Sequence, residues 1–464
     1  MAASSDGQDW SCSGLGGVQS NPLSGLHEVV GQLSGPPALL WQGQAEANAL
    51  LYIAAQAVLG SLEPPANEPR RAAFVRSVAA ALASFVAQGQ LPPPPPEVAL
   101  YGSSASGLHF AASDLDLTLL LALGVAEQRA LVGRLAALFG ATPGFEAHAQ
   151  LPPAVRVPSL RLRHAELGGG HAAQGVTAQL TCGDSLGLAS TRLVSCYLQI
   201  DDRARGLCML VKHWAARRQL ASPREGTPSS FCWVLLALNH LQCLRVLPCL
   251  QAPELLAGRT AEHWDRGYGL APDGRSVPYA FCGNPNEQRR APAPTPFTRS
   301  ASHPPLTRSP PRPLSPAHPR TCSPPPPPPS LSRLRYMMAE GRRGELDLVD
   351  LLHDFFSVLL AYSATHVFSV GGGARLERAK RGWLAEQQRL AVEDPMDRER
   401  NLGDMVTAAT MARITEEARR AQALLHGARQ TRPSPIASRQ AADDLFADLF
   451  SERGAGAGDA RGRQ

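Results

Sequence analysis

The sequence lacks the patterns expected of a disulfide-bonded, zinc-binding, membrane-spanning or secreted protein. Its nine cysteines are scattered, with no Cys-x-x-Cys pair and no nearby histidine at zinc-finger spacing, so we expect reduced thiols. The most apolar window, 231–250, is interrupted by polar residues such as Asn239 and Arg245, and it cannot supply the roughly 20 apolar residues of a membrane span. The N-terminus has no basic segment followed by an apolar run. We therefore expect an untargeted protein of the cytoplasm or nucleus with no membrane partner.

A large excess of charge of one sign is also absent. The net charge is +5 and charged residues make up 18% of the chain, which permits a polyanionic partner without requiring one. The 464 residues, of which 44% are hydrophobic, suffice for two or three domains. Proline and glycine are both abundant, at 41 residues each, and much of the proline gathers in a few stretches. Part of the chain is therefore predicted not to fold.

Helical periodicity precedes a short strand in the first third of the chain. Apolar residues recur at helical spacing over 45–88, with a Pro-Pro break at 64–65, which predicts two helices. A run of prolines follows at 92–96, and residues 98–101 have the composition of a strand. Residues 1–40 are rich in Gly, Ser and Pro and show little periodicity, so we expect a disordered tail there.

A second segment without periodicity interrupts the other half of the chain. Residues 284–335 consist mostly of Pro, Ser, Thr and Arg, with eight arginines and a single acidic residue. Such a segment cannot bury enough surface to fold, so it is predicted to be a disordered basic insertion, either a plain tether or a contact site for RNA or proteins. Helical patterns follow at 346–362 and 408–425. The tail 427–464 is again predicted to be disordered, with one short apolar patch at 445–450.

The strongest functional pattern lies directly after the predicted strand. Gly102 and Ser103 are followed by a glycine at 107 and then by an Asp-x-Asp pair, Asp114 and Asp116. Side chains at i and i+2 of a strand point to one face, so both carboxylates can share divalent cations. Two Mg²⁺ ions held in this way would neutralise a triphosphate and bind the attacking and leaving oxygens of an in-line transfer. An isolated Asp-x-Asp is common in surface sequence, but the preceding Gly-Ser pattern makes it specific.

This pattern resembles the signature of polymerase-β-like nucleotidyltransferases, and later blocks resemble one branch, the non-canonical poly(A) polymerases and terminal uridylyltransferases. The blocks occur in the family's order between residues 45 and 425, which is more specific than any one of them. They are Lys212 to Ala215, Gly226 to Phe231, Glu345 to Tyr362, and Glu393 to Gly403.

The resemblance implies an α+β fold in two parts. A polymerase-β-like nucleotidyltransferase domain, a small mixed sheet with helices, would occupy 41–200 together with its leading helices. A mainly helical poly(A)-polymerase-associated domain would comprise 201–283 and 336–426. The disordered tails 1–40 and 427–464 and the insertion 284–335 would complete the chain.

The resemblance also implies roles for individual residues in the first domain and the helix that follows it. Asp114 and Asp116 would be catalytic ligands of Mg²⁺ or Mn²⁺, and Gly102 and Ser103 would approach the phosphates through backbone N–H groups. Lys212 would contact the triphosphate as a point charge, whereas a solvated helix lysine is the alternative. Ser190 and Thr191 would lie near the ribose.

In the second domain four further positions would bind the nucleotide. Ser230 would hydrogen-bond a phosphate at a helix N-terminus, and a plain N-cap role does not exclude this. Phe231 would stack on the base, with a place in the hydrophobic core as the alternative. Asp394 and Asp397 would lie beside the base, with helix capping as the alternative.

Several positions depart from the family pattern. The third catalytic carboxylate is expected on a strand upstream of Leu186 to Thr191, and an alignment without gaps puts Gln179 there. A neutral amide cannot balance metal charge or accept the proton of an RNA 3′-hydroxyl. Asp184 is the nearest carboxylate, but an offset of five residues along a strand would turn it to the other face, unless a loop or bulge returns it.

Two more departures concern nucleotide binding. Ala216 stands where a second phosphate-binding lysine is usual, with Arg217 and Arg218 beside it as stand-ins. Arg400 takes the place at which uridine-selective relatives carry His, so a preference for ATP or UTP is left open.

The leading hypothesis is therefore an enzyme that adds AMP or UMP to RNA 3′ ends from ATP or UTP, weakened by Gln179. The first alternative is a catalytically silent relative that binds nucleotide or RNA or acts as a scaffold. The second is a nucleotidyltransferase for a small molecule or a protein. Since no RNA-binding module is recognisable, specificity for a given RNA would come from protein partners or from the basic segment.

Overall fold

The structure is a computed structural model, and it describes most of the chain outside two long segments. The described residues are 37–62, 68–111, 113–151, 157–164, 176–253, 256, 264–271, 274–283, 346–383, 389–430 and 436–453. The predicted insertion 284–335 lies outside them, as does the predicted tail up to residue 36.

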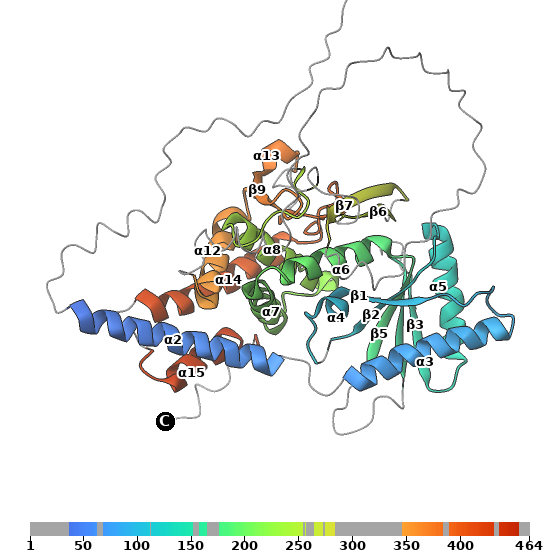
Figure 1. The fold of residues 1–464 in the computed structure, drawn as a ribbon, viewed down its shortest axis with the longest axis horizontal. Helices are drawn as coiled ribbons and strands as arrows, with labels where there is room; N and C mark the ends of the chain where they lie inside the picture. The colour runs from blue at the N-terminus through green and yellow to red at the C-terminus, as the bar shows by residue number, and fades with distance from the viewer. Residues whose placement is uncertain are drawn as a thin grey trace, which may run out of the picture.

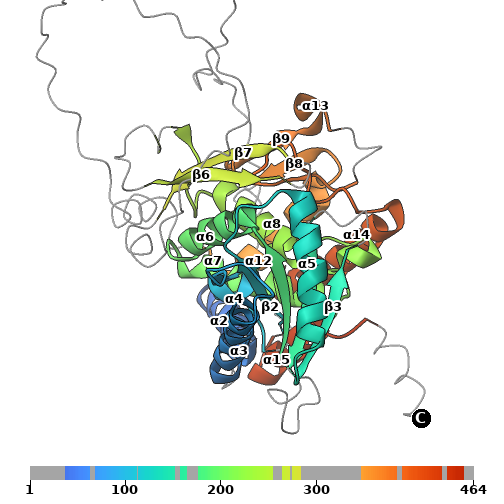
Figure 2. The same ribbon diagram turned by 90° about the vertical axis from the view of Figure 1, so that its right-hand side faces the viewer.

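One part of the molecule is a five-stranded mixed sheet with the order β1-β2-β5-β4-β3. On β2, β4 and β5 alternate residues are buried and apolar, and they pack with two helices, α3 and α5, into one hydrophobic core. Figures 1 and 2 show α3 and α5 beside this sheet. The elements are α3 (Glu68–Ala87), β1 (Val98–Tyr101), β2 (Leu115–Leu119), α5 (Val125–Gly140), β3 (Phe145–Gln150), β4 (Ser159–His164) and β5 (Thr177–Cys182). The other face of the sheet carries the polar residues of these strands, because side chains alternate along a strand.

The second part is mainly helical and has a separate, larger core. Its centre is formed by Trp214, Trp233 and Phe356, whose rings make edge-to-face contacts. The helices that contribute to this core are α2 (Pro37–Leu62), α6 (Ser185–Leu198), α7 (Asp202–Arg217), α8 (Ser230–Cys243), α12 (Leu348–Tyr362), α14 (Ala408–Gln430) and α15 (Arg439–Leu449).

Two small sheets accompany these helices. β6 (Trp264–Leu270) and β7 (Ser276–Cys282) form an antiparallel hairpin, and β8 (His366–Ser369) pairs with β9 (Ala374–Glu377) and with β10 (Val392–Glu393). Short helical turns complete the described elements: α4 (Gly102–Ser106), η3 (Pro223–Glu225) and α13 (Arg378–Arg381). The α+β fold class and its division into a mixed sheet with helices and a mainly helical part are thus confirmed.

The first helix does not belong with the sheet, although 41–200 was expected to form one domain. Buried residues of α2, among them Leu51 and Ala54, lie in the core of the helical part. In Figure 1 α2 runs alongside α14 and α15, away from the sheet. The described part of the chain therefore passes from α2 in the helical part to the sheet through α3, and returns through α6.

The prediction of a disordered C-terminal tail at 427–464 is also wrong for most of the residues described there. α14 continues to Gln430, and α15 follows at 439–449 with Ser438 as its N-cap, whose hydroxyl accepts a hydrogen bond from the Ala441 N–H. Phe446 and Leu449 of the apolar patch are buried in the core that α2 also lines. The prediction of disorder rested on composition. It failed because the stability of this segment comes from contacts with residues of α2, far away in the sequence.

No helix among the described residues is long and apolar enough to cross a membrane.

Candidate active site

The turn from β1 into α4 lies against the side chain of Asp116. Tyr101, the last residue of β1, pairs in register with Asp116 on β2. The next residue, Gly102, has φ +65°, and a Cβ at this position would collide with the Asp116 carboxylate. The Ser103 backbone N–H donates to that carboxylate. A glycine is therefore required at 102, since it permits both the left-handed backbone and the close approach.

The two predicted metal ligands lie next to each other at the start of β2. Asp114 is exposed just before the strand, and Asp116 is half-buried on it. Burial raises the pKa of Asp116 to about 6, and the negative charges of Asp114 and Asp184 act in the same direction. Lys212 and the Ser103 N–H lower this pKa and partly offset the effect. Asp116 is thus a carboxylate whose charge is incompletely balanced by the protein, which favours binding of a cation.

Gln179 lies where the gapless alignment put the third carboxylate. β2 and β5 are parallel, and Asp116 pairs with Gln179 in register. Paired residues of adjacent strands share one face, so the amide and the carboxylate are on the polar face of the sheet. The Gln179 Nε2 donates to Ser159 Oγ of β4 at 3.0 Å. Its side chain is therefore held toward β4 by a neutral hydrogen bond.

Asp184 reaches the same region by a route that strand geometry did not predict. β5 ends at Cys182, and Asp184 is the N-cap of α6, where its Oδ1 accepts from the Gly187 N–H at 2.9 Å. It also hydrogen-bonds the Tyr101 side chain, and it raises the pKa of Asp116. The expectation that an odd offset turns Asp184 away was wrong, because the strand stops before residue 184. Burial raises the pKa of Asp184 itself, while the Gly187 N–H, Arg400 and Tyr101 lower it.

Lys212 extends from α7 toward these carboxylates. It is 6% exposed, and its Nζ donates to the Leu108 carbonyl at 2.6 Å and lies 4.8 Å from the centre of the Phe110 ring. Burial lowers the pKa of Lys212 to about 8, although Asp116 raises it. An ammonium has three donors, so two remain for a ligand. The alternative of a solvated lysine is excluded by its burial.

Thr191 supports the Gly-Ser turn from the helical side. Its Oγ1 accepts from the Gly102 N–H at 2.8 Å and donates to the Gly187 carbonyl at 2.8 Å. Ser190, the preceding residue of α6, is buried. The α6 helix thus joins the turn after β1 to the helical part of the molecule.

The start of α8 separates the roles of its two serines. Ser229 is the N-cap, and its Oγ accepts from the Cys232 N–H at 3.1 Å. Ser230 is the first helical residue, so its hydroxyl does not cap the helix. The plain N-cap role that was one interpretation of this position belongs to Ser229. Phe231 is partly buried against the core of the helical part.

The block at 394–400 contributes an ion pair that faces the sheet. Asp394 Oδ1 accepts from the Met396 and Asp397 N–H groups, and its Oδ2 lies 3.3 Å from Arg400 Nη1. Burial raises the pKa of Asp394, and Arg400 lowers it. The positive charge of Arg400 also lowers the pKa of Asp184. Asp394 therefore caps a turn and not a helix, so the helix capping given as the alternative to base contact does not occur.

Arg217 and Arg218 do not replace the missing phosphate-binding lysine. Arg218 forms a buried, two-pronged ion pair with Glu417, with both N···O distances at 2.8 Å. Arg217 donates to the Phe450 carbonyl and pairs with Glu452. The two guanidinium groups instead bind α14 and the segment at the end of α15. The prediction that they stand in for a phosphate-binding lysine was therefore wrong.

Arg71 is a supporting residue that the motif comparison missed. It is buried on α3, and its guanidinium donates to Ser104 Oγ at 2.5 Å and to the Ser113 carbonyl at 2.7 Å. It thereby connects the Gly-Ser turn to the segment that carries Asp114. A signal was present in the sequence, because Arg71 lies on the apolar stripe of its helix, three residues before Phe74.

The donor set fits a divalent cation that is completed by a substrate. Among the described residues, no three His, Cys, Asp or Glu side chains come together as a metal-binding group. Mg²⁺, however, is commonly held by one or two carboxylates together with phosphate oxygens and waters. Asp114 and Asp116 supply the two carboxylates, and burial raises the pKa of Asp116 although Lys212 lowers it.

Comparison with known proteins agrees with this geometry. Residues 57–199 match the family described as the central palm domain of mitochondrial-like poly(A) RNA polymerase. The terminal uridylyltransferase cid1 of Schizosaccharomyces pombe is 33% identical over 150 residues, which are 32% of this chain and 35% of cid1. Poly(A) RNA polymerase GLD2 of Danio rerio is 30% identical over 159 residues, 33% of this chain and 31% of GLD2. The matched stretches thus span about a third of these curated relatives.

The fold extends further than the sequence match. The structure of Cid1 in complex with its short product ApU has a TM-score of 0.56 and 22% identity, covering 87% of this chain and 98% of that one. The molecule therefore has the fold of Cid1, a mixed sheet with helices joined to a mainly helical part. Within it, residues 57–199 are similar to the central palm domain of mitochondrial-like poly(A) RNA polymerase.

Proposed function

We propose that the protein adds ribonucleotides, AMP or UMP, to RNA 3′ ends without a template, from ATP or UTP, in a reaction that depends on Mg²⁺ or Mn²⁺. The observation that supports this most is the arrangement at Asp116. A half-buried carboxylate of raised pKa lies beside Asp114, directly under a Gly-Ser turn and close to the ammonium of Lys212. Cation, phosphate-contacting backbone and phosphate-contacting lysine would then converge on one triphosphate.

The metal would be held by Asp114 and Asp116, and it would neutralise phosphate charge and lower the pKa of a bound hydroxyl. The chain's own residues bind and orient the substrate. Lys212 has two donors left for the triphosphate, and the burial that lowers its pKa also strengthens its interaction with an anion. Ser230 has a hydroxyl free of the cap, at the N-terminus of an α-helix of 14 residues, where anions are favoured.

The base would lie between Phe231 and the block at 394–400. A ring face is sufficient for stacking, so a Phe is adequate here. Arg400 offers only donors, and Asp394 holds one of its nitrogens. The remaining donors suit acceptor edges such as uracil O4 or adenine N7, which gives a soft preference between ATP and UTP.

The direct test is incubation of purified protein with a labelled RNA and each NTP separately, in Mg²⁺ and in Mn²⁺. Extension that is abolished by Asp116→Asn supports the proposal. Asp202→Asn is the matched control, because Asp202 is an exposed aspartate at the start of α7. If neither ATP nor UTP is transferred in either metal, the proposed activity is wrong.

A catalytically silent relative is the second candidate, and the pairing of Asp116 with Gln179 favours it. Such a protein would bind NTP and metal through Asp114 and Asp116 but would not extend RNA. Binding of a labelled NTP with Mg²⁺, lost in Asp116→Asn and unaccompanied by extension, would identify this case.

We further propose that RNA specificity comes from protein partners or from the basic segment 284–335, which carries eight arginines. The described cysteines are all free thiols, which fits action in the cytoplasm or nucleus.

A further inference from the structure

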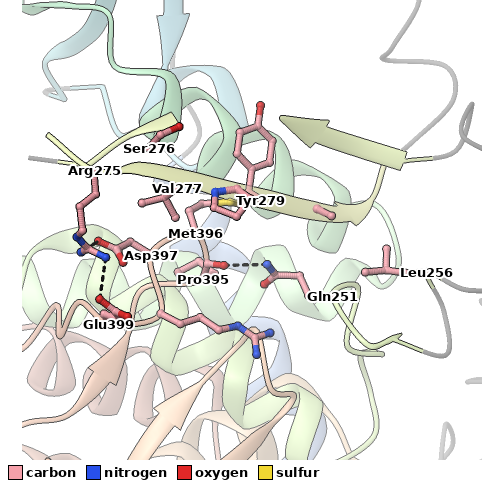
Figure 3. Close-up of a pocket in the computed structure, with 13 residues that line it drawn as sticks. Gln251, Leu256, Arg275, Ser276, Val277, Tyr279, Pro395, Met396, Asp397 and Glu399 are labelled. Atoms are coloured by element: carbon pink, nitrogen blue, oxygen red, sulfur yellow. Dashed lines mark hydrogen bonds and ion pairs between the residues drawn. The ribbon is translucent and has the colours of Figure 1, made fainter. Parts of the chain in front are cut away.

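A pocket of about 670 Å³ lies beside the candidate nucleotide site and shares one turn with it. One wall is β7, and the opposite wall is the turn at 395–399, which directly follows Asp394 (Figure 3). Of the residues predicted to lie beside the base, Asp397 lines it, and there its carboxylate pairs with Arg275. Ser230, Phe231, Asp394 and Arg400 do not line it, so the pocket is a neighbouring site that shares only this turn with the proposed nucleotide site.

One face of the β6–β7 hairpin, which forms this wall, packs against α6. Arg192 of α6 forms an ion pair with Asp265 of β6 and donates to the Tyr279 hydroxyl at 3.1 Å. Across from Tyr279 lies Gly267, where a Cβ would come within 2.8 Å of that hydroxyl, so a glycine is required for this packing. Tyr279 thus points toward α6, and the residues on either side of it face the other way.

That other face of the hairpin is exposed and carries a pattern typical of single-stranded nucleic acid binding. Trp264, Arg266 and Tyr268 follow each other at i, i+2 and i+4 on β6, so they share one face. The Arg266 guanidinium lies 5.8 Å from the centre of the Trp264 ring, and Tyr268 is 65% exposed. Aromatic rings that alternate with arginine provide stacking surfaces and phosphate contacts.

The interior of the pocket offers apolar surface together with an unused polar atom. Pro278 and Ala280 of β7 pair with Tyr268 and Arg266, so they belong to the exposed face, and Met396 and Leu256 add apolar surface. Gln251 is 8% exposed, and its Nε2 donates to the Pro395 carbonyl at 2.8 Å. Its Oε1 is buried and has no hydrogen-bond partner in the described part of the chain. A buried acceptor without a partner is costly, so it indicates a ligand that donates.

The charges of the pocket restrict what this ligand is. Arg275 bridges the two walls at one end, with 3.2 Å to Asp397 and 2.7 Å to Glu399 (Figure 3). With Arg398, the lining carries two positive and two negative side chains and has no net charge. A triphosphate would not be attracted to it, whereas a neutral nucleobase would be.

We propose that this pocket binds a nucleobase of single-stranded RNA upstream of the 3′ end, with the strand continuing over Trp264, Arg266 and Tyr268. Gln251 Oε1 accepts a base N–H, and Pro278 and Met396 contact the ring. This proposal rests on the proposed function for the identity of the RNA end, but it concerns binding and not transfer.

The test measures binding of a fluorescent single-stranded RNA by anisotropy, without NTP, so that it is independent of catalysis. Ala280→Phe fills the pocket and should weaken RNA binding about tenfold, the loss expected for one stacked base. Ala57→Phe, at an exposed alanine of α2, is the matched control and should leave binding unchanged. Tyr268→Ala should weaken binding by a similar factor, against Tyr52→Ala, which also removes an exposed tyrosine.

Two further measurements keep the proposal falsifiable if Ala280→Phe fails to fold. Wild-type protein crosslinked to RNA that contains 4-thiouridine should yield RNA adducts on the peptide of residues 276–280. Gln251→Met should weaken RNA binding and leave NTP binding unchanged. Any of three results would overturn the proposal. They are no adducts on the hairpin, unchanged RNA affinity in Gln251→Met and Tyr268→Ala, or variants that lose NTP binding and not RNA binding. Absence of nucleotide transfer would refute only the proposed function.

Discussion

Gln179 lies directly beside Asp116 on the adjacent parallel strand, at the position where a third carboxylate would complete the metal site. The alignment without gaps put the third catalytic position at Gln179, and the register of β5 places this residue on the face of the sheet that carries Asp116. What the alignment did not predict is the second carboxylate nearby, Asp184, which caps α6 and acts on Asp116 through its charge. Two positions, Gln179 and Asp184, therefore compete for the role of the third carboxylate.

Replacing Gln179 by Asp should raise the rate of RNA extension. The new carboxylate adds metal charge and a proton acceptor next to Asp116, and general-base effects are typically worth roughly 10²- to 10⁴-fold. The wild-type protein should bind NTP with Mg²⁺ but extend RNA slowly. Single-turnover extension of a labelled RNA measures the gain, with Gln179→Glu as a control for the position of the carboxylate.

Asp184→Asn distinguishes the competing assignment. Asn retains a cap oxygen for the Gly187 N–H, so α6 should remain intact while the charge is removed. We expect extension to fall by less than about tenfold, since Gln179 and not Asp184 pairs with Asp116. Full wild-type activity that Gln179→Asp leaves unchanged and Asp184→Asn abolishes would assign the third carboxylate to Asp184.

Asp116→Asn should abolish activity and yet stabilise the protein at pH 7 in the absence of metal. The pKa of Asp116 is raised to about 6 in the folded state, so the folded protein binds the proton more tightly than the unfolded chain. Its contribution to stability is therefore lost as the pH rises from about 4 to about 6. Removing the charge should recover on the order of 2 kcal/mol at pH 7 and almost nothing at pH 4.

Urea unfolding of both proteins at pH 4 and pH 7 with EDTA measures this difference. Asp202→Asn, at an exposed position, should show no gain at either pH. Equal stability of wild type and Asp116→Asn at pH 7 would mean that the carboxylate is well solvated or balanced.

The elements with strong local patterns could be predicted from the sequence, and those stabilised by distant contacts could not. The two helices predicted within 45–88 and the strand at 98–101 have clear periodicity and breakers, and the structure has them at 37–62, 68–87 and 98–101, so only the start of the first helix was misplaced. Asp184 was misplaced because the end of β5 depends on the turn into α6, which no local pattern marks. α15 was missed because its apolar residues are buried by contacts with elements distant in the sequence, chiefly α2. The burial of Arg218 against Glu417 likewise depends on a contact across the helical part.

Deletion of residues 284–335, with a short Gly/Ser linker in their place, should leave the fold intact. The composition of this segment, rich in Pro, Ser, Thr and Arg, cannot offset the entropy of ordering it. Thermal unfolding monitored by circular dichroism checks this. A melting temperature many degrees lower, or failure to fold, would show that the segment packs against the remainder.

Base choice should be relaxed, with ATP used at least as well as UTP. Arg400 has donors only, and its Nη1 already contacts Asp394, so it can approach acceptor edges of either base. Competition of the two labelled nucleotides at equal concentration measures the ratio of kcat/KM. A preference for UTP over ATP above roughly a hundredfold, about 2.7 kcal/mol, would contradict this expectation.

Phe446→Ala should destabilise the protein by about 3–5 kcal/mol, the usual cost of removing a buried phenylalanine. Its ring is 1% exposed, and it lies 5.9 Å from the centre of the Phe450 ring, in the core that α2 and α15 share.

Loss of α15 would also free Arg217 from the Phe450 carbonyl and weaken the C-terminal end of α7, the helix that carries Lys212. We therefore expect weaker NTP binding in a chain that ends at residue 435, with Asp444→Ala on the same helix as the control. A truncated chain as stable as the full one, with equal NTP affinity, would show that α15 contributes neither to the fold nor to the site.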